Sequence, residues 1–490
     1  MSFNDLLYSG GKLQIDLFDV LLLFRLHRYV FSGDIENFYR QIKVHPDDWK
    51  FQRILWYSGS QLITYELTTD TYPSRGRYIG DIVSGANTIE EAQAQIKQII
   101  DLCMEGGFPI QKWISNQPDI LSHVPPKKHL EALSKSMDEN FTVHALGLAW
   151  HPRADTFNFT IKLATDLPVT KRKILSAIAQ IFDPLGFLTP VVIMTKVFIQ
   201  ELWTVKLGWD DELCQDDSHM WIEYLDQLQE LQQLSIPRWI QLTSTSSFEI
   251  HGFCDASQKD IAAVAYVRVL INKTPTVTLI YAKTKVAPFK RLIIPRLELA
   301  AAVLLSRLLK HVITSMSWDN YSIHCWTDSS ITYTWVNNHP SRWKEFVHNR
   351  VNFIQETLPS AQCRFVPGRL NPADCATRGL TSSELINHSL WWNGLSWLAQ
   401  PTDSWPNEGQ ADFTPENLEE QPDIQILKKE EQLNKNHPLI RLTPWLDPAG
   451  IMRVSGRLQN SSLNTDARQP IILPRRHHLS DLVILDVRID

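Results

Sequence analysis

The chain has 490 residues, 43% of them hydrophobic and 21% charged, which is enough for about three domains with apolar cores. A formal net charge of −6 excludes a surface coated in nucleic-acid-binding charge, although short basic tracts occur at 171–173 and 475–478. The six cysteines form no Cys-x-x-Cys pair, and no apolar run reaches membrane-spanning length. We therefore expect an intracellular, cytoplasmic protein that is neither secreted nor membrane-bound, with the nucleus as the alternative location.

In chain order, the first clear pattern is a β-hairpin expected at 146–161, followed by helices from Lys171 onward. Runs rich in β-branched and aromatic residues then predict five strands, at 248–255, 261–269, 276–282, 323–328 and 362–367. The mixture of strands and helices in this half of the chain indicates an α/β domain.

Two helices are expected among and after these strands. From Arg296, leucines and alanines repeat at helical spacing, so a helix is expected between the third and fourth strands. A last helix is expected to begin near Asp374, because the proline of Asn371-Pro372-Ala373 suits a helix N-terminus.

Four carboxylates stand at the ends of these elements: Asp255 and Asp328 each end a strand, and Glu298 and Asp374 each lie in the first turn of a helix. Taken singly, each acid is more often a turn, cap or helix-dipole residue. Their order along the chain allows two strand ends and two helix starts to point four acids at one place. Such a cluster repels itself unless divalent cations fill it, as two-metal phosphodiester hydrolysis requires.

This order of strands, helices and acids is that of ribonuclease H, and the chain resembles the polyprotein of Bel/Pao-type long-terminal-repeat retrotransposons. The resemblance rests on motifs spread over nearly the whole chain, at 3–42, 171–186, 208–211, 365–379, 390–398 and 446–458. It implies a multidomain protein of α/β and α+β class with four parts. These are a truncated reverse transcriptase palm at 1–120, a thumb and connection region at 121–245, a ribonuclease H-like domain with a five-stranded mixed sheet at 246–385, and a linker with a truncated integrase lead-in at 386–490.

The palm departs from the family pattern. A polymerase palm needs one aspartate on a strand and an Asp pair at a hairpin tip to hold two magnesium ions. Asp34 stands at the first position, but Gly80-Asp81 stands where the resemblance implies Asp-Asp. Glycine supplies no ligand, and the segment that the resemblance implies before Ser74, with its template-positioning helix, is missing. We therefore expect a degenerate palm site that does not synthesise DNA.

The middle and the tail offer little further chemistry. Trp150, Trp203 and Trp209 could stack on bases, but core packing is the favoured explanation. A retrotransposon aspartic peptidase is an alternative function, although the chain has no Asp-Thr-Gly or Asp-Ser-Gly loop for a carboxylate pair. No zinc site is expected, because no cysteine follows Cys375.

The function that we predict is hydrolysis of the RNA strand of RNA–DNA hybrids by two Mg²⁺ ions, with Mn²⁺ as a substitute, held by the four carboxylates. Ser329 could donate to the nucleic-acid backbone, but capping the following helix is favoured slightly. Arg369 is a candidate phosphate contact. The alternative is a catalytically silent remnant that binds nucleic acid without cutting it.

Overall fold

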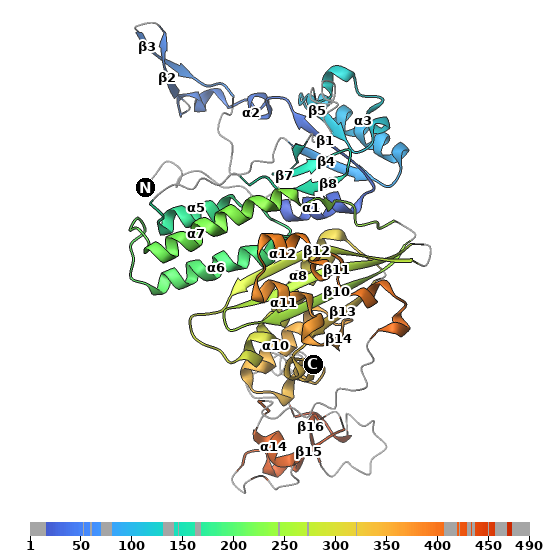
Figure 1. Cartoon of the computed structure of the whole chain (residues 1–490). Coiled ribbons are helices and arrows are strands. Elements are labelled where there is room, and N and C mark those ends of the chain that lie inside the picture. Colours follow the sequence, from blue (N-terminus) through green and yellow to red (C-terminus); the bar gives the residue numbers. More distant parts are fainter. Residues whose placement is uncertain are drawn as a thin grey trace.

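A computed structural model of the chain describes residues 16–472 apart from gaps, the longest of which are 70–80, 131–141, 406–418 and 456–467. The elements follow one another along a single long axis, from the N-terminal sheet at the top of Figure 1 to the short C-terminal strands at the bottom. The largest sheet occupies the lower middle of the molecule, and helices cover it on several sides.

The N-terminal part contains a three-stranded antiparallel sheet in the order β4 (Asp81–Ala86), β1 (Tyr29–Ile35), β5 (Ile110–Ser115). Helix α3 (Ile89–Glu105) begins with a capping box between Thr88 and Glu91 and packs on this sheet around Phe31 and Trp113. The short helix α2 (Phe38–Gln41) leads to a separate hairpin of β2 (Arg53–Ser58) and β3 (Gln61–Glu66) that extends away from the rest (Figure 1).

The middle part combines a small sheet with three helices. The sheet order is β6 (Val143–Ala145), β7 (Leu148–His151), β8 (Thr156–Asn158), β9 (Ile236–Pro237), and the antiparallel β7–β8 pair confirms the expected hairpin. The helices are α5 (Lys171–Gln180), α6 (Thr189–Thr204) and α7 (Gln215–Leu228). The core-packing expectation is right for Trp150, which is 0% exposed, and wrong for Trp203 and Trp209, which are 53% and 44% exposed.

The five-stranded sheet is mixed, as expected, with the order β12 (Thr274–Val286), β11 (Asp260–Ile271), β10 (Ser247–Ala256), β13 (Ser322–Thr327), β14 (Gln362–Phe365). The first three strands are antiparallel, whereas β10, β13 and β14 run parallel. Since β10 and β13 are adjacent and parallel, the residues that follow them emerge at the same edge of the sheet. That edge carries the predicted acids.

Two layers cover this sheet. On one face lies α8 (Ile294–Met316), and the close approach needs Gly252, because a Cβ there would lie 2.6 Å from Leu305 Cδ1. On the other face lies the segment 389–405, from the region where we expected a linker and an integrase lead-in. There Tyr266 donates to the Trp391 carbonyl oxygen at 2.7 Å, and Trp405 packs edge-on against His251.

The remaining helices of this part are α9 (Ser330–Val336), α10 (Glu345–Thr357), α11 (Pro372–Arg378), α12 (Ser382–Ile386) and α13 (Ser389–Asn393). Beyond them, α14 (Pro422–Lys428) and the antiparallel pair β15 (Pro444–Leu446) and β16 (Met452–Val454) form a small separate group.

Helix α8 differs from the expectation that no apolar segment is long enough to span a membrane. Its 23 residues are long and apolar enough to cross a membrane by those criteria alone, although we expected no such run. In this structure 56% of its most apolar window is buried, as expected of the core helix of a sheet.

The apolar core is continuous across the boundary expected near residue 245. Helix α1 (Leu17–Leu26) carries Arg25, which is 0% exposed and donates to the carbonyl oxygens of Leu279 and Ile280 in β12 at 2.9 and 3.0 Å. The same guanidinium donates to the Arg238 carbonyl oxygen at 3.0 Å. Three parts of the chain are therefore joined at one buried cation, so experiments on the acids at the sheet edge need the full chain.

Candidate metal centre

Three of the four predicted acids meet at the edge of the five-stranded sheet. Asp255 near the end of β10, Glu298 on α8 and Asp328 just after β13 each offer a carboxylate oxygen, and these atoms lie within 4.8 Å of one another. Asp255 is 6% exposed and Glu298 is 7% exposed. The parallel pairing of β10 with β13 brings the two aspartates together, and α8 delivers the glutamate from the next layer.

One local detail differs from the sequence-based expectation. Helix α8 begins at Ile294, with Pro295 in its first turn, so Glu298 is the fifth helical residue and lies beyond the first turn. A role in complementing the helix dipole is therefore weakened, because that effect is confined to the first turn.

The fourth acid stands at the rim. Asp374 lies in the first turn of α11, as expected, and its charge raises the pKa of both Glu298 and Asp328. Arg378, four residues later, forms an ion pair with it at 2.7 Å. Asp374 is thus close enough to interact electrostatically with the other three acids, and within the described part of the chain it is the one of the four that forms an ion pair with a basic side chain.

Burial and mutual repulsion dominate the electrostatics. Burial, followed by the charges of Asp255 and Asp328, raises the pKa of Glu298 to about 9. Burial and the charge of Asp255 raise the pKa of Asp328 to about 6, and burial also raises the pKa of Asp255. The cluster therefore cannot be fully ionised near neutral pH without added positive charge.

The donor atoms fit a hard divalent cation. Glu298 Oε2 and Asp328 Oδ1 are buried and have no hydrogen-bond partner among the described residues. Buried carboxylate oxygens without partners are costly, and oxygen ligands are those that Mg²⁺ and Mn²⁺ prefer. Asp255, Glu298 and Asp328 are thus the residues whose oxygens could hold such an ion, with Asp374 at the rim.

Helix α11 also supplies residues that hold the acids in place. The Thr377 hydroxyl donates to Asp255 Oδ2, and the Asn371 amide donates to the Cys254 carbonyl oxygen at 2.9 Å. Asn371 also caps α11 by accepting from the Ala373 N–H at 3.1 Å, and its hydrogen bond to Asp328 partly offsets the rise in that acid's pKa caused by burial. We did not single out Asn371 or Thr377 from the sequence, where only the cap preference of an Asn before a proline pointed to the first.

The two predicted nucleic-acid contacts lie beside the acids. The Ser329 hydroxyl accepts from the Thr332 N–H at 3.2 Å, so this side chain caps α9, the favoured alternative. Arg369 is exposed in the short 3₁₀-helix η7 (Gly368–Leu370), next to Gly368, whose Cβ would lie 2.9 Å from Asp328 Oδ2. Its position at the rim leaves it available to a ligand of this site.

The acids of the expected palm site have different surroundings. Asp34 and Asp81 are register partners on β1 and β4, and Lys112 forms an ion pair with Asp34 at 2.6 Å. Burial and the charge of Asp34 raise the pKa of Asp81, while Lys112 lowers it. Gly80, the third predicted residue of this degenerate site, lies outside the described residues.

A second cluster, of Glu249, His251 and His324, also has ligand atoms within 4.8 Å of one another. Trp326 donates to His251 Nδ1 at 3.2 Å, which leaves the ring proton on Nε2, facing Glu249 at 3.4 Å. Arg268 binds the same carboxylate at 2.8 Å. These contacts favour a buried hydrogen-bond network over a metal site.

Comparison with known proteins identifies one region. Residues 170–329 match a family model described as the Pao retrotransposon-like RNaseH-like domain, a range that includes Asp255, Glu298 and Asp328. No curated protein matches the chain.

Three solved structures of a foamy viral protease-reverse transcriptase are similar. The one in complex with an RNA/DNA hybrid has 13% identity and a TM-score of 0.43, and the match covers 73% of this chain and 46% of that chain. A form called dRH, in complex with double-stranded DNA, has 14% identity, a TM-score of 0.44 and coverages of 73% and 60%. A third, also with double-stranded DNA, has 13% identity, a TM-score of 0.44 and coverages of 74% and 72%. This chain thus spans less than half the length of the first relative, and likenesses this distant carry no argument about function.

Proposed function

We propose that this chain, which carries the RNase H-like region of a Pao-type retrotransposon pol protein, cuts the RNA strand of RNA–DNA hybrids at its four clustered carboxylates. The observation that carries the proposal is the buried meeting of Asp255, Glu298 and Asp328, with two of their oxygens unpartnered. A structural role would be expected to pair these oxygens with donors, because unpaired buried carboxylates destabilise a fold.

The protein's own residues would hold and orient two divalent cations. When bound, such a pair activates an attacking water and stabilises the leaving 3′ oxygen. Asp255, Glu298 and Asp328 form the inner part of the site, and Asp374 closes its rim from α11. Thr377 orients Asp255 by its hydrogen bond, so the carboxylate is positioned before any ion arrives.

Selectivity for the RNA strand would come from outside the acid cluster. Contacts to 2′-hydroxyl groups across the shallow minor groove distinguish an RNA strand from DNA without reading its bases. Arg369, at the rim of the site, is the candidate phosphate contact.

The test asks whether the full-length protein cleaves a labelled RNA–DNA hybrid. Single-stranded RNA and double-stranded DNA serve as competing substrates. We expect Mg²⁺-dependent cutting of the hybrid RNA, and its loss in Asp328→Asn, which keeps the shape of the side chain but removes its charge. The matched control is Asp226→Asn, at an exposed position on α7. Equal cutting by Asp328→Asn and the parent would remove Asp328 from the site, and a parent that binds hybrid but never cuts would establish the silent remnant.

A further inference from the structure

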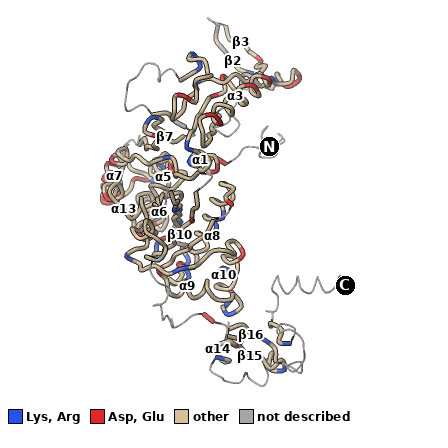
Figure 2. The backbone as a smooth tube through the Cα atoms, turned by 90° about the vertical axis from the view of Figure 1, so that its right-hand side faces the viewer, with Lys and Arg blue, Asp and Glu red and all other residues tan. Residues whose placement is uncertain are grey.

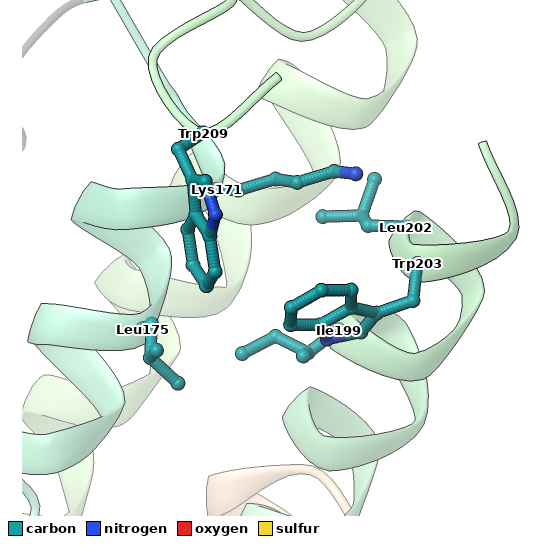
Figure 3. A pocket seen from close by; sticks show the side chains of 6 residues that line it. All are labelled: Lys171, Leu175, Ile199, Leu202, Trp203 and Trp209. Carbon is teal, nitrogen blue, oxygen red and sulfur yellow. The ribbon is translucent and has the colours of Figure 1, made fainter. Parts of the chain in front are cut away.

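Two exposed tryptophans form a shallow slot at the end of the α5–α6 pair. Trp203, in the last turn of α6, is 53% exposed, and Trp209, in the loop that follows, is 44% exposed. Figure 3 shows the two indoles approaching each other, with Lys171 reaching across above them and Leu175 and Ile199 below. Together with Leu175, which is 44% exposed, they form a contiguous apolar patch, and such patches mark candidate binding sites.

The two indoles are held in a fixed arrangement. Their ring centroids lie 5.1 Å apart with an interplanar angle of 89°, so the edge of one ring faces the other. The Arg172 N–H donates to the Trp209 carbonyl oxygen at 3.1 Å. Lys171 donates to the carbonyl oxygens of Val205 and Leu207 at 3.2 and 3.0 Å, which anchors the loop between the two tryptophans. The exposed aromatic faces are therefore preorganised for a ligand.

Positive charge remains available beside these rings. The Lys171 ammonium lies 5.8 Å from the centroid of Trp203, and only two of its three donors are used by the loop carbonyls. Lys206, also in the loop, is exposed. A fixed ammonium next to two aromatic faces matches a ligand that combines a flat ring with an anion.

Three acids near the slot have partners, whereas Glu212, in the same loop, is exposed. Asp210 forms a two-bond ion pair with Arg172 at 2.7 and 3.0 Å, and Asp211 accepts from the Gly208 N–H at 2.6 Å. Glu201 forms an ion pair with Lys259 at 2.8 Å. By contrast, the hollow between α6 and α7, lined by Met194 and Met220, lies beside a helix whose charged residues are all acidic (Figure 2). Of these two hollows, the tryptophan slot suits an anionic ligand.

The slot is also connected to the acid cluster. Lys259, the partner of Glu201, lies in the turn that follows Asp255. Gln200 donates to the Ala287 carbonyl oxygen at 2.6 Å, in the loop that leads into α8 and Glu298. The last two turns of α6 therefore contact both loops next to the metal centre and then continue to Trp203.

We propose that the exposed surface of Trp203 and Trp209 binds an unpaired nucleotide of a single-stranded nucleic acid, whose base stacks on the outer face of one indole while its phosphate contacts Lys171. Stacking on aromatic side chains tolerates any base, so the site would hold a strand without reading its sequence. This proposal rests on the proposed nuclease function only in its choice of nucleic acid as the ligand. It assigns to this part of the chain a strand-binding role that is separate from cutting.

The test uses a fluorescein-labelled single-stranded oligonucleotide of mixed sequence. Its binding to the full-length protein is measured by fluorescence anisotropy in a buffer with EDTA. We expect Trp203→Ala and Trp209→Ala each to weaken binding roughly ten-fold, from the stacking contribution of one base. Trp203→Phe, which keeps an aromatic face, should recover part of the loss. Met220→Ala is the matched control, because this residue is 52% exposed on the neighbouring helix α7.

Two further readouts distinguish a base from other occupants. Quenching of indole fluorescence on adding the oligonucleotide should be largest in the parent and should fall in both alanine variants. Lys171→Ala should reduce the dependence of binding on salt. Melting curves that match the parent show that a variant has folded.

Unchanged binding by folded alanine variants, or binding without quenching, would overturn the proposal and leave the slot as a contact for an apolar or proline side chain of another protein. Because EDTA removes divalent ions, the result does not depend on cutting. A chain that fails to cut hybrids yet loses oligonucleotide binding in Trp203→Ala supports the slot and refutes the nuclease. The opposite pattern refutes the slot alone.

Discussion

Replacing Glu298 with glutamine should stabilise the metal-free protein at neutral pH. The carboxyl is 7% exposed, and its pKa is raised to about 9 by burial and then by the charges of Asp255 and Asp328. Glutamine has nearly the same shape and is always neutral, so the variant folds without the free-energy cost of protonating this carboxyl at neutral pH. A variant of a functional acid that gains stability is the expected sign of a site selected for binding cations.

The magnitude follows from linkage. The pKa of Glu298 in the folded protein, about 9, lies above its ordinary value of 4.5, so the folded state holds a proton that the unfolded state releases. The contribution of this group to stability is therefore fully present below about pH 4.5 and is lost as the pH rises through about 9. By pH 7 the loss amounts to about 3 kcal/mol, which is an upper limit for the gain from Glu298→Gln.

The assay is chemical unfolding of the parent and Glu298→Gln at pH 5, 7 and 8 in EDTA, followed by the same series in Mg²⁺. The gain should be small at pH 5 and grow with pH, and Mg²⁺ should stabilise the parent more than the variant. Glu345→Gln, at an exposed position in the first turn of α10, is the matched control and should show neither trend. A gain that does not change with pH, or a variant less stable than the parent at pH 7, would refute the cluster electrostatics.

Three further outcomes are expected. Thr377→Val should weaken calorimetrically measured Mg²⁺ binding roughly ten-fold while Thr377→Ser retains it, and equal affinities would show that the hydroxyl does not orient Asp255. Primer extension should detect no DNA synthesis by the chain or by Gly80→Asp, and extension by the parent would contradict the degenerate palm. Burial lowers the pKa of His324 to about 3, below its ordinary value of 6.5. The contribution of His324 to the free energy of unfolding is therefore intact above pH 6.5 and is lost as the pH falls toward 3. His324→Gln should flatten this acid destabilisation in melting curves, and an unchanged slope would exclude His324 as its source.

Much of the nuclease fold could be predicted because its strands carry a local signal. Strands β10 to β14 are runs of β-branched and aromatic residues, and each was expected within a few residues of its observed place. The positions of Asp255 and Asp328 could be predicted together with the strands, because both residues lie at a strand end. The end of a strand determines the edge of the sheet at which such a side chain lies. The mixed order of the sheet came from the resemblance, since pairing between distant strands leaves little trace in the sequence.

The start of α8 was misjudged because Ile293 and Ile294 resemble strand residues as much as helical ones, and Pro295 is compatible with either. The exposure of Trp203 and Trp209 could not be predicted, because it depends on how the loop after α6 is anchored by Lys171. Such contacts depend on tertiary packing that local patterns do not encode.

The covering of the sheet by 389–405 was also missed. The polar stretch 400–436 suggested a linker, and residues 390–398 were expected to belong to the integrase lead-in. The attachment of 389–405 depends on a buried cation far away in the chain: Arg268 in β11 donates to the carbonyl oxygens of Leu398 and Gln400 at 2.7 and 2.8 Å. A charged residue inside a strand gave no indication of which backbone it would bind.

The two acid sites of this chain differ in how their charge is balanced, and this difference bears on function. At the palm, Lys112 is an internal partner for Asp34, with their side chains 61% and 35% exposed, so that site is stable without a metal ion. At the sheet edge, the described basic partner is Arg378 on Asp374 at the rim, and Glu298 and Asp328 keep unpartnered oxygens inside. Either protonation or a bound cation can relieve that repulsion. We therefore expect the Asp34–Asp81 pair to need no metal ion, and the acids at the sheet edge to bind one.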